Sequence, residues 1–398
     1  ILGLVTILAG AAWAASTPQV IYSFGGGSDG EYTDTELVVD GAGNLYGTSV
    51  QGGAFSSGTV FQLTPSGSGW IHTVLYDFTG GADGGEPYKG VTLDSHGNLY
   101  GTAVTGGGGS CEGGCGVVFK LTNSGGVWTQ SVIHTFTGGT DGSGPGSPVS
   151  FDKHGNLYGM APTGGAKGFG VVFQMTPGSS GTWKFRVIHT FTGGVDGLGG
   201  SAGRLLLDAA GNVYGVSTVG GANGFGNVFE ISQSQGKWQL TTLYSFKDQP
   251  DGASPYGGVI FGKDGNLYGT TYYAGANDAG TVYQLTHSNN SWTESVLYSF
   301  KGGSDGDSPI STLAADAKGN LYGTTSDGGA AKCGCGTIFR LSRGSGGVWS
   351  ESVFYRFPGV PKAGFAYNGV VSDSKGNFYG ASVHGGTGND GAIYQFTP

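Results

Sequence analysis

The stretch Gly43-Asn44-Leu45-Tyr46-Gly47 decides the fold, because it returns six more times along the chain. Each copy reads Gly-Asn, then Leu, Val or Phe, then Tyr-Gly, and the Asn residues are Asn44, Asn98, Asn156, Asn212, Asn266, Asn320 and Asn377. Neighbouring copies lie 54 to 58 residues apart, as from residue 44 to residue 98. Self-similarity at such a period indicates a repeat architecture.

Each repeat contains four short runs of strand-forming residues. In the second repeat they are residues 91–94, 98–104, 117–121 and 128–136, named A to D here. Val, Leu, Tyr, Phe and Trp runs bounded by Gly, Ser and Asn are typical of strands, and no window has a helical period. Four antiparallel strands in each radial repeat form a β-propeller. A linear solenoid, the alternative, would need polar capping repeats, and none is found.

The two ends of the chain predict how the ring closes. Residues 20–24 match the end of run D in other repeats, such as residues 74–78, and residues 393–396 match run C. The seventh repeat therefore lacks its own run D, which the N-terminal segment supplies, and the pairing removes both free sheet edges. We expect an all-β, seven-bladed β-propeller over residues 16–398.

The composition excludes several classes of protein. With 85 Gly among 398 residues the chain could be disordered, but 37% hydrophobic and 12% aromatic residues are too many for that. Charged residues make up 11% and the net charge is −9, without a basic run. Nucleic-acid binding needs a basic footprint, so we expect none.

Residues 1–15 resemble an export signal that is clipped at its start. An apolar run is followed by small residues, and Ala12-Trp13-Ala14 fits a cleavage site. A short buried helix or a membrane anchor is the alternative, although the run is short for a bilayer span. We expect a secreted or cell-surface monomer with no membrane span in the mature chain.

Repeated aromatic and acidic residues are interpreted as structural. The Trp that opens run D and the Tyr of the motif predict packing between blades. An Asp four residues before the motif Asn predicts a turn between A and B, and Gly262 replaces it in the fifth repeat. A second Asp follows run D, at Asp29, Asp83, Asp141, Asp196, Asp251 and Asp305, with Lys362 at the seventh junction. We favour turns there too; Ca²⁺ stays an alternative, although single, dispersed carboxylates suit it poorly.

The four cysteines occur only in the two repeats whose B–C loops are longer than the others. They are Cys111, Cys115, Cys333 and Cys335. In an exported protein an even number of cysteines predicts disulfides, here the local bridges Cys111–Cys115 and Cys333–Cys335. A shared zinc site would need the second and sixth repeats to meet across the ring, so we expect no metal site.

The pattern resembles the bacterial tandem-repeat family called GloVer. The resemblance rests on Gly43–Thr48, the doublet Gly52-Gly53 and the run Gly58–Thr64, and covers nearly the whole mature chain. It implies export and often a surface anchor, whereas this sequence stops at Thr397-Pro398 without one, and it implies no activity. Kelch propellers have shorter repeats. The sialidase Asp-box would need an Asp in the C–D turn, but residues 64–69, which are expected to form this turn in the first repeat, contain no Asp.

Propeller topology places the B–C and D–A loops on one face, and these loops are the more varied set. No nucleophile–base–acid combination stands out, so we expect no catalytic residues and no cofactor. Aromatic and polar loop residues predict a binding site for a glycan or an extracellular protein on this face, although solvated loop residues are the alternative. The candidates are Tyr88, Tyr256, Tyr272, Tyr273, Tyr367, Arg204, Glu86, Asp327 and His384. A polysaccharide lyase or hydrolase is the rival function.

Overall fold

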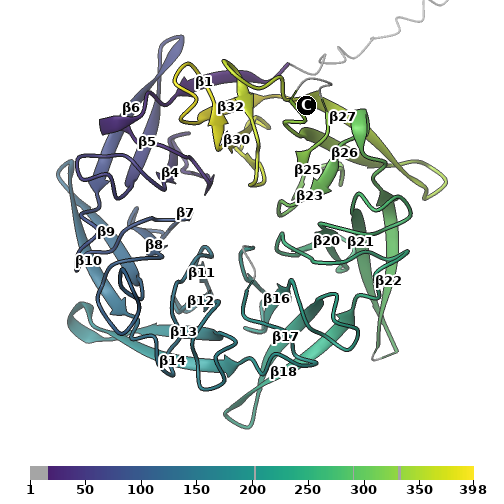
Figure 1. Cartoon of the computed structure of the whole chain (residues 1–398), viewed down its shortest axis with the longest axis horizontal. Helices are drawn as coiled ribbons and strands as arrows, with labels where there is room; N and C mark the ends of the chain where they lie inside the picture. Colours follow the sequence, from purple (N-terminus) through teal and green to yellow (C-terminus); the bar gives the residue numbers. More distant parts are fainter. Residues whose placement is uncertain (1–16, 201–202, 290, 330–332) are drawn as a thin grey trace, which may run out of the picture.

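Seven β-sheets surround a central channel in the computed structural model (Figure 1). The structure describes residues 17–200, 203–289, 291–329 and 333–398. The predicted export signal, residues 1–15, lies outside the described residues. The prediction of a seven-bladed β-propeller is confirmed, and each blade contains four antiparallel strands, A to D from the channel outward.

The two inner strands of each blade are short and line the channel side. Strands A are β3 (Val38–Val39), β7 (Lys89–Leu93), β11 (Ser150–Phe151), β15 (Leu206–Leu207), β19 (Ile260–Phe261), β24 (Ala314–Ala315) and β29 (Val371–Ser372). Strands B are β4 (Leu45–Ser49), β8 (Leu99–Ala103), β12 (Leu157–Ala161), β16 (Val213–Ser217), β20 (Leu267–Thr271), β25 (Leu321–Asp327) and β30 (Phe378–Ser382).

The two outer strands are longer and form the rim of the ring. Strands C are β5 (Thr59–Ser66), β9 (Val117–Ser124), β13 (Val171–Pro177), β17 (Asn227–Ser234), β21 (Thr281–Ser288), β26 (Thr337–Arg343) and β32 (Ala392–Phe396). Strands D are β6 (Gly69–Asp77), β10 (Val127–Thr135), β14 (Trp183–Thr190), β18 (Lys237–Ser245), β22 (Ser291–Ser299), β27 (Trp349–Arg356) and β1 (Gln19–Ser23).

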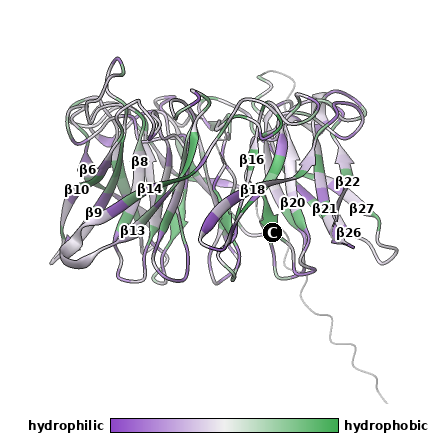
Figure 2. Ribbon diagram, turned by 90° about the horizontal axis from the view of Figure 1, so that it is seen from below, coloured by the Kyte–Doolittle hydropathy of each residue, from purple (hydrophilic) through white to green (hydrophobic). Residues whose placement is uncertain are grey.

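Short elements in the loops complete the chain. They are β2 (Thr35–Glu36), β23 (Asp307–Pro309), β28 (Ala363–Gly364), β31 (His384–Gly385) and the 3₁₀ turns η1 (Gly27–Asp29), η2 (Ser179–Gly181) and η3 (Gly303–Asp305). β2 runs parallel to β7 and so ties the first blade to the second. Seen from the side, loops project beyond the strands on both faces (Figure 2).

The ring closes as the sequence predicted. β1 pairs antiparallel with β32, from Gln19 opposite Gln395 to Ser23 opposite Ala392. The N-terminal strand is therefore the outer strand of the seventh blade, and in Figure 1 the purple start of the chain lies against its yellow end. This pairing gives the seventh blade its fourth strand and joins the two ends of the chain in one sheet.

Strands C and D run further than predicted in the first blade. A turn was expected over residues 64–69, but β5 continues to Ser66 and β6 begins at Gly69, directly opposite it. Since a hairpin needs only two residues between its strands, Thr64 and Pro65 remain in the sheet. The expected turn was too long because Pro and Ser are typical of loops.

The repeated aromatic residues pack between blades, as predicted. The Trp of strand D meets the Tyr of strand B in the preceding blade edge to face, with ring centroids 5.8 to 6.4 Å apart. These pairs are Trp70–Tyr379, Trp128–Tyr46, Trp183–Tyr100, Trp238–Tyr158 and Trp349–Tyr268. The edge-to-face arrangement is the one that aromatic quadrupoles favour.

The motif Asn and Tyr close the A–B turn through the preceding Asp. In the first blade Asp40 Oδ1 accepts from the backbone N–H of Asn44 at 2.9 Å, and Oδ2 accepts from the Asn44 amide at 2.8 Å and the Tyr46 hydroxyl at 3.0 Å. In the fifth blade, where Gly262 stands in place of this Asp, Asp264 accepts from Asn266 and Tyr268 instead. The turn therefore keeps a carboxylate even where the repeat pattern loses it.

Candidate binding site at the channel mouth

The Asp ring of the D–A loops fixes the loops themselves. In the second blade Asp83 Oδ2 accepts from the backbone N–H of Thr79 and from the Tyr76 hydroxyl, both at 2.9 Å. Equivalent bonds recur around the ring, for example at Asp29 with Tyr22. These carboxylates thus have the turn role that the sequence favoured. Among the described residues, no three His, Cys, Asp or Glu side chains are arranged to hold a metal ion.

Both disulfides form as predicted, Cys111–Cys115 and Cys333–Cys335. Each lies against a Gly of the following D–A loop: a Cβ on Gly138 would lie 2.8 Å from Cys111 Sγ, and one on Gly359 would lie 2.9 Å from Cys335 Sγ. The two longer B–C loops therefore fold back onto their neighbours. This location gives the disulfides a packing role at the rim.

Tyrosines gather beside the channel mouth over the fifth blade. Tyr256 and Tyr272 have ring centroids 5.5 Å apart, and Tyr272 meets Tyr273 edge to face at 4.4 Å. Tyr273 is 53% exposed and Tyr256 36% exposed. Tyr256 also lines a narrow cavity in the channel together with Tyr367 of the sixth D–A loop. The predicted candidates from three loops thus form one aromatic surface, called the tyrosine mouth below: Tyr256, Tyr272, Tyr273 and Tyr367.

Carboxylates lie within electrostatic range of these rings. Burial raises the pKa of Tyr367, and the charge of Asp327 raises it further. The pKa of Tyr88 is raised by burial first and then by Glu86 and Asp34. Tyr88 therefore lies near Glu86 and Asp34, and Tyr367 lies within range of both Asp327 and Asp34.

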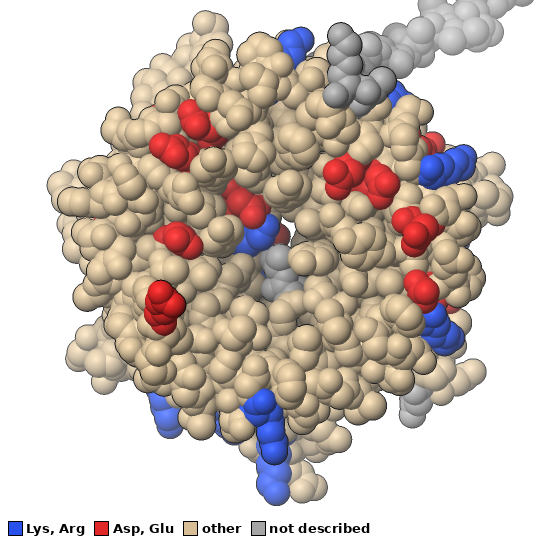
Figure 3. Space-filling view, viewed as in Figure 1, with Lys and Arg blue, Asp and Glu red and all other residues tan. Residues whose placement is uncertain are grey.

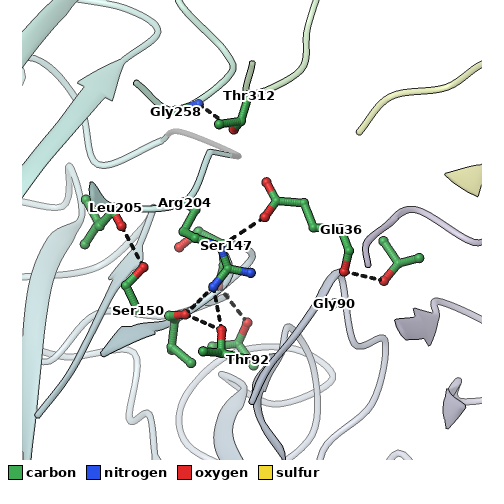
Figure 4. A network of polar contacts seen from close by, with 12 residues as sticks. Glu36, Gly90, Thr92, Ser147, Ser150, Arg204, Leu205, Gly258 and Thr312 are labelled. Atoms are coloured by element: carbon green, nitrogen blue, oxygen red, sulfur yellow. Dashed lines mark hydrogen bonds and ion pairs between the residues drawn. The ribbon is translucent and has the colours of Figure 1, made fainter. Parts of the chain in front are cut away.

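Arg204 lies inside the channel and not on the open face. Its Nε donates to Glu36 Oε2 at 3.1 Å, and its Nη1 donates to the backbone oxygen of Val149 at 2.7 Å and to the Thr92 hydroxyl. Figure 4 shows the guanidinium between these partners from the first three blades. Red and blue side chains meet at the centre of the ring in Figure 3. The sequence predicted Arg204 as a surface binding residue. Its guanidinium bonds within this network instead, so Arg204 is a bridge across the channel.

A second polar cluster, called the channel floor below, lies next to this bridge. Lys89 Nζ pairs with Asp34 Oδ1 at 2.7 Å, and the Asn368 amide donates to the same oxygen at 2.5 Å. Lys89 and Asn368 are 8% and 4% exposed. Both line the same narrow cavity as Tyr256 and Tyr367. The three residues come from the second, first and seventh blades.

Sequence reasoning missed Asp34, Glu36, Lys89 and Asn368, although the repeats contain a signal for them. Each repeat has a buried apolar residue directly before strand A or, in the second blade, inside it: Leu37, Val91, Val149, Leu205, Val259, Leu313 and Val370. The residue before it is Glu36, Gly90, Pro148, Arg204, Gly258, Thr312 or Gly369. Only two of these seven are charged, and their charges are opposite. At the position before this one, five repeats have Thr, Ser or Gly, whereas the second has Lys89 and the seventh has Asn368.

His384 is linked to the tyrosine mouth through Phe365, whose ring centroid lies 6.4 Å from that of Tyr367. His384 lies in β31, which pairs with β28, and its ring meets Tyr32 at 5.4 Å and Phe365 at 5.7 Å, edge to face in both cases. These contacts join loops of the seventh and first blades. The structure thus brings together four of the predicted tyrosines with Asp327, links His384 to them through Phe365, and places Tyr88 near Glu86 and Asp34.

Known proteins with a similar fold give no closer description of the site. A protein of Lactobacillus plantarum is 12% identical with a TM-score of 0.54, covering 89% of this chain and 99% of its own. A candidate 6-phosphogluconolactonase of Bacteroides uniformis is 14% identical with a TM-score of 0.50, covering 79% and 83%. At such identities the likeness concerns the fold alone. No curated protein sequence is detectably similar to this chain.

The sequence profile that does match describes repeats. The Gloeobacter/Verrucomicrobia repeat matches residues 107–293 and 202–398, which together span more than half of the chain. No helix among the described residues is long and apolar enough to cross a bilayer. The motif spacing, the ring of seven blades and this match agree, and the chain belongs to the Gloeobacter/Verrucomicrobia repeat family.

Proposed function

We propose that this chain is an exported, non-catalytic binding module that takes a glycan at the tyrosine mouth. The observation that carries the proposal is the packing of Tyr256, Tyr272 and Tyr273 beside the channel, with two of the rings open to solvent. Ligand sites combine aromatic surfaces with a few polar groups, and Tyr offers both. Sugar rings, which have apolar faces and hydroxyl edges, suit such a surface. Export is supported by the two disulfides.

The rival function, a polysaccharide lyase or hydrolase, needs titratable groups tuned at the binding surface. The pKa values of Glu294 and Glu351 are raised to about 7, by burial first and then by Asp251 and Asp305 respectively. Both glutamates belong to outer strands, β22 and β27, and face the D–A Asp of the preceding blade. The two glutamates with these raised pKa values therefore fit a structural role better than a catalytic one.

Calorimetric titration of the predicted mature chain, residues 16–398, tests the proposal. The probes are cellohexaose, laminarihexaose, mannohexaose, xylohexaose, chitohexaose and hexagalacturonate. We expect at least one to bind, and Tyr256→Ala and Tyr273→Ala each to weaken that binding at least tenfold. Phe55→Ala is the matched control, since Phe55 is 58% exposed in the B–C loop of the first blade. Binding to none of the probes, or equal losses in all three variants, would contradict the proposal.

An extracellular protein is the other partner class that the sequence suggested. A protein partner would cover a wider part of the face than a sugar chain, because stable protein interfaces bury about 800 Å² on each side. Under that alternative none of the six hexasaccharides would bind.

A further inference from the structure

The channel floor departs from the repeat in a way that packing does not require. The position of Lys89 is occupied in the other repeats by Thr35, Ser147, Gly203, Gly257, Ser311 and Asn368. Where the residue is Thr35, Ser147 or Ser311, its hydroxyl accepts a backbone N–H of strand B at 2.9 to 3.3 Å. Lys89 and Asn368 instead reach Asp34, at the preceding position of the first repeat.

Keeping this cluster costs free energy. Lys89 has a φ of 64°, the left-handed region that residues other than Gly rarely adopt. Its ammonium and the carboxylate of Asp34 are also largely removed from water, with side chains 11% and 15% exposed. A buried ion pair is often no more stabilising than apolar residues of similar volume. Strain combined with a buried ion pair at one place is typical of a functional site.

The channel floor has donors and acceptors that no described residue uses. Among the described residues, Asp34 Oδ1 is the only hydrogen-bond partner of the Lys89 ammonium, which has three donors. Asp34 Oδ2 and Asn368 Oδ1 accept from no described donor. A donor and two acceptors at one place match neighbouring hydroxyl groups of a sugar, which both donate and accept.

The cavity that Lys89 and Asn368 line is small. It has about 10 Å³ of free space, room for one water-sized group, and Tyr256 and Tyr367 form part of its wall. The ion pair between Arg204 and Glu36 lies next to it, because Glu36 also lines the cavity. A cavity of this size has no room for a whole sugar ring. One hydroxyl or hydroxymethyl group can enter the cavity while the rest of the sugar lies on the tyrosines.

We propose that the channel floor, Asp34, Lys89 and Asn368, is a recognition site for the terminal sugar of a neutral glycan, which binds end-on. The inference rests on the proposed function and adds the ligand class and the orientation. Lys89 donates to one terminal hydroxyl, and Asp34 and Asn368 accept from its neighbours. The charges of the floor and of the bridge next to it cancel in pairs, Lys89 with Asp34 and Arg204 with Glu36, so no net charge is left for an anionic sugar.

The test uses the same six hexasaccharides, adding for each that binds its tetrasaccharide and its long polymer, at equal concentrations of chains. One variant carries Asp34→Leu and Lys89→Met together, which replaces the ion pair by apolar side chains and keeps the volume. The second is Asn368→Ala. Thermal unfolding confirms that each variant is folded. We expect a neutral hexasaccharide to lose at least tenfold in affinity in both variants.

End-on binding also predicts equal affinity per chain for the tetrasaccharide and the polymer, because each chain has one terminal sugar of the kind recognised. Affinity that rises with chain length, binding of hexagalacturonate alone, or neutral binding that Tyr273→Ala abolishes and both floor variants keep would overturn the inference and leave the proposed function standing. Binding to none of the probes would overturn both.

Discussion

Arg204 Nε donates to Glu36 Oε2 over 3.1 Å although 168 residues separate them in the chain. The contact joins the fourth blade to the first across the channel, and no neighbouring pair of blades could make it. Both partners are partly buried, with side chains 26% and 17% exposed. The pair therefore ties the two halves of the ring together.

Removing one partner of this bridge is expected to destabilise the ring. Arg204→Met leaves Glu36 without its partner, and a lost hydrogen bond to a charged group costs about 1.5–3 kcal/mol. Urea unfolding of Arg204→Met, Glu36→Gln and the double variant measures the coupling, which we expect to be at least about 0.5 kcal/mol. Arg186→Ala, at an exposed position of β14, is the control. Additive effects of the two single variants would contradict a direct bridge.

The seams between blades predict a dependence of stability on pH. Glu294 faces Asp251 and Glu351 faces Asp305, and the pKa of each glutamate is raised to about 7, by burial first. An unfolded Glu has a pKa of about 4.3, so the folded chain binds the extra proton. The stabilisation is complete below about pH 4.5 and is lost as the pH rises through 7. Its slope is at most about 1.4 kcal/mol per pH unit for each group.

The second blade already has Gln at the position of these two glutamates. Gln130 occupies the position of Glu294 there, and its amide donates to the backbone oxygen of Asp83 at 3.0 Å. Glu294→Gln and Glu351→Gln should therefore fold and should make the fall in unfolding free energy between pH 5 and 8 shallower. Urea titrations at several pH values measure this slope. An unchanged slope in the double variant would refute the assignment.

In the fifth blade Asp264 takes the turn role that the Asp before the motif has in the other blades, since Gly262 stands at that position. Asp264→Ala should destabilise the chain by about 1–3 kcal/mol, since it removes the acceptor of both Asn266 and Tyr268. Asp278→Ala, an exposed loop position of the same blade, should have little effect. Thermal unfolding compares them. Equal stability of the two variants would show that Asp264 does not replace the missing turn carboxylate.

Reduction of the disulfides should loosen two loops and leave the ring intact. The bridge Cys111–Cys115 closes a loop with a sequence separation of 4, for which chain entropy gives about 2 kcal/mol. Cys111→Ser with Cys115→Ser should therefore lower the melting temperature modestly and increase amide exchange over residues 106–116. Loss of cooperative unfolding would contradict a rim role.

The fold could be predicted from the sequence because the same signals occur in every repeat. Seven copies of Gly-Asn-x-Tyr-Gly set the number of blades, and the spare strand at Val20–Phe24 set the closure. The bridge and the channel floor were not predicted, because each residue in them occurs once and departs from the repeat. Their partners lie in different blades, so only the closed ring brings Arg204 to Glu36 and Asn368 to Asp34. Aligning the repeats identifies the departures, but it does not show which of them meet.

The central claim, that a glycan binds at the tyrosine mouth, is tested most directly by hydrogen–deuterium exchange with and without the tightest-binding hexasaccharide. We predict slower exchange over residues 254–258, 271–275 and 366–370, and unchanged exchange in the A–B and C–D turns of the opposite face. Protection confined to those turns, or to the outer edges of the blades, would contradict the claim.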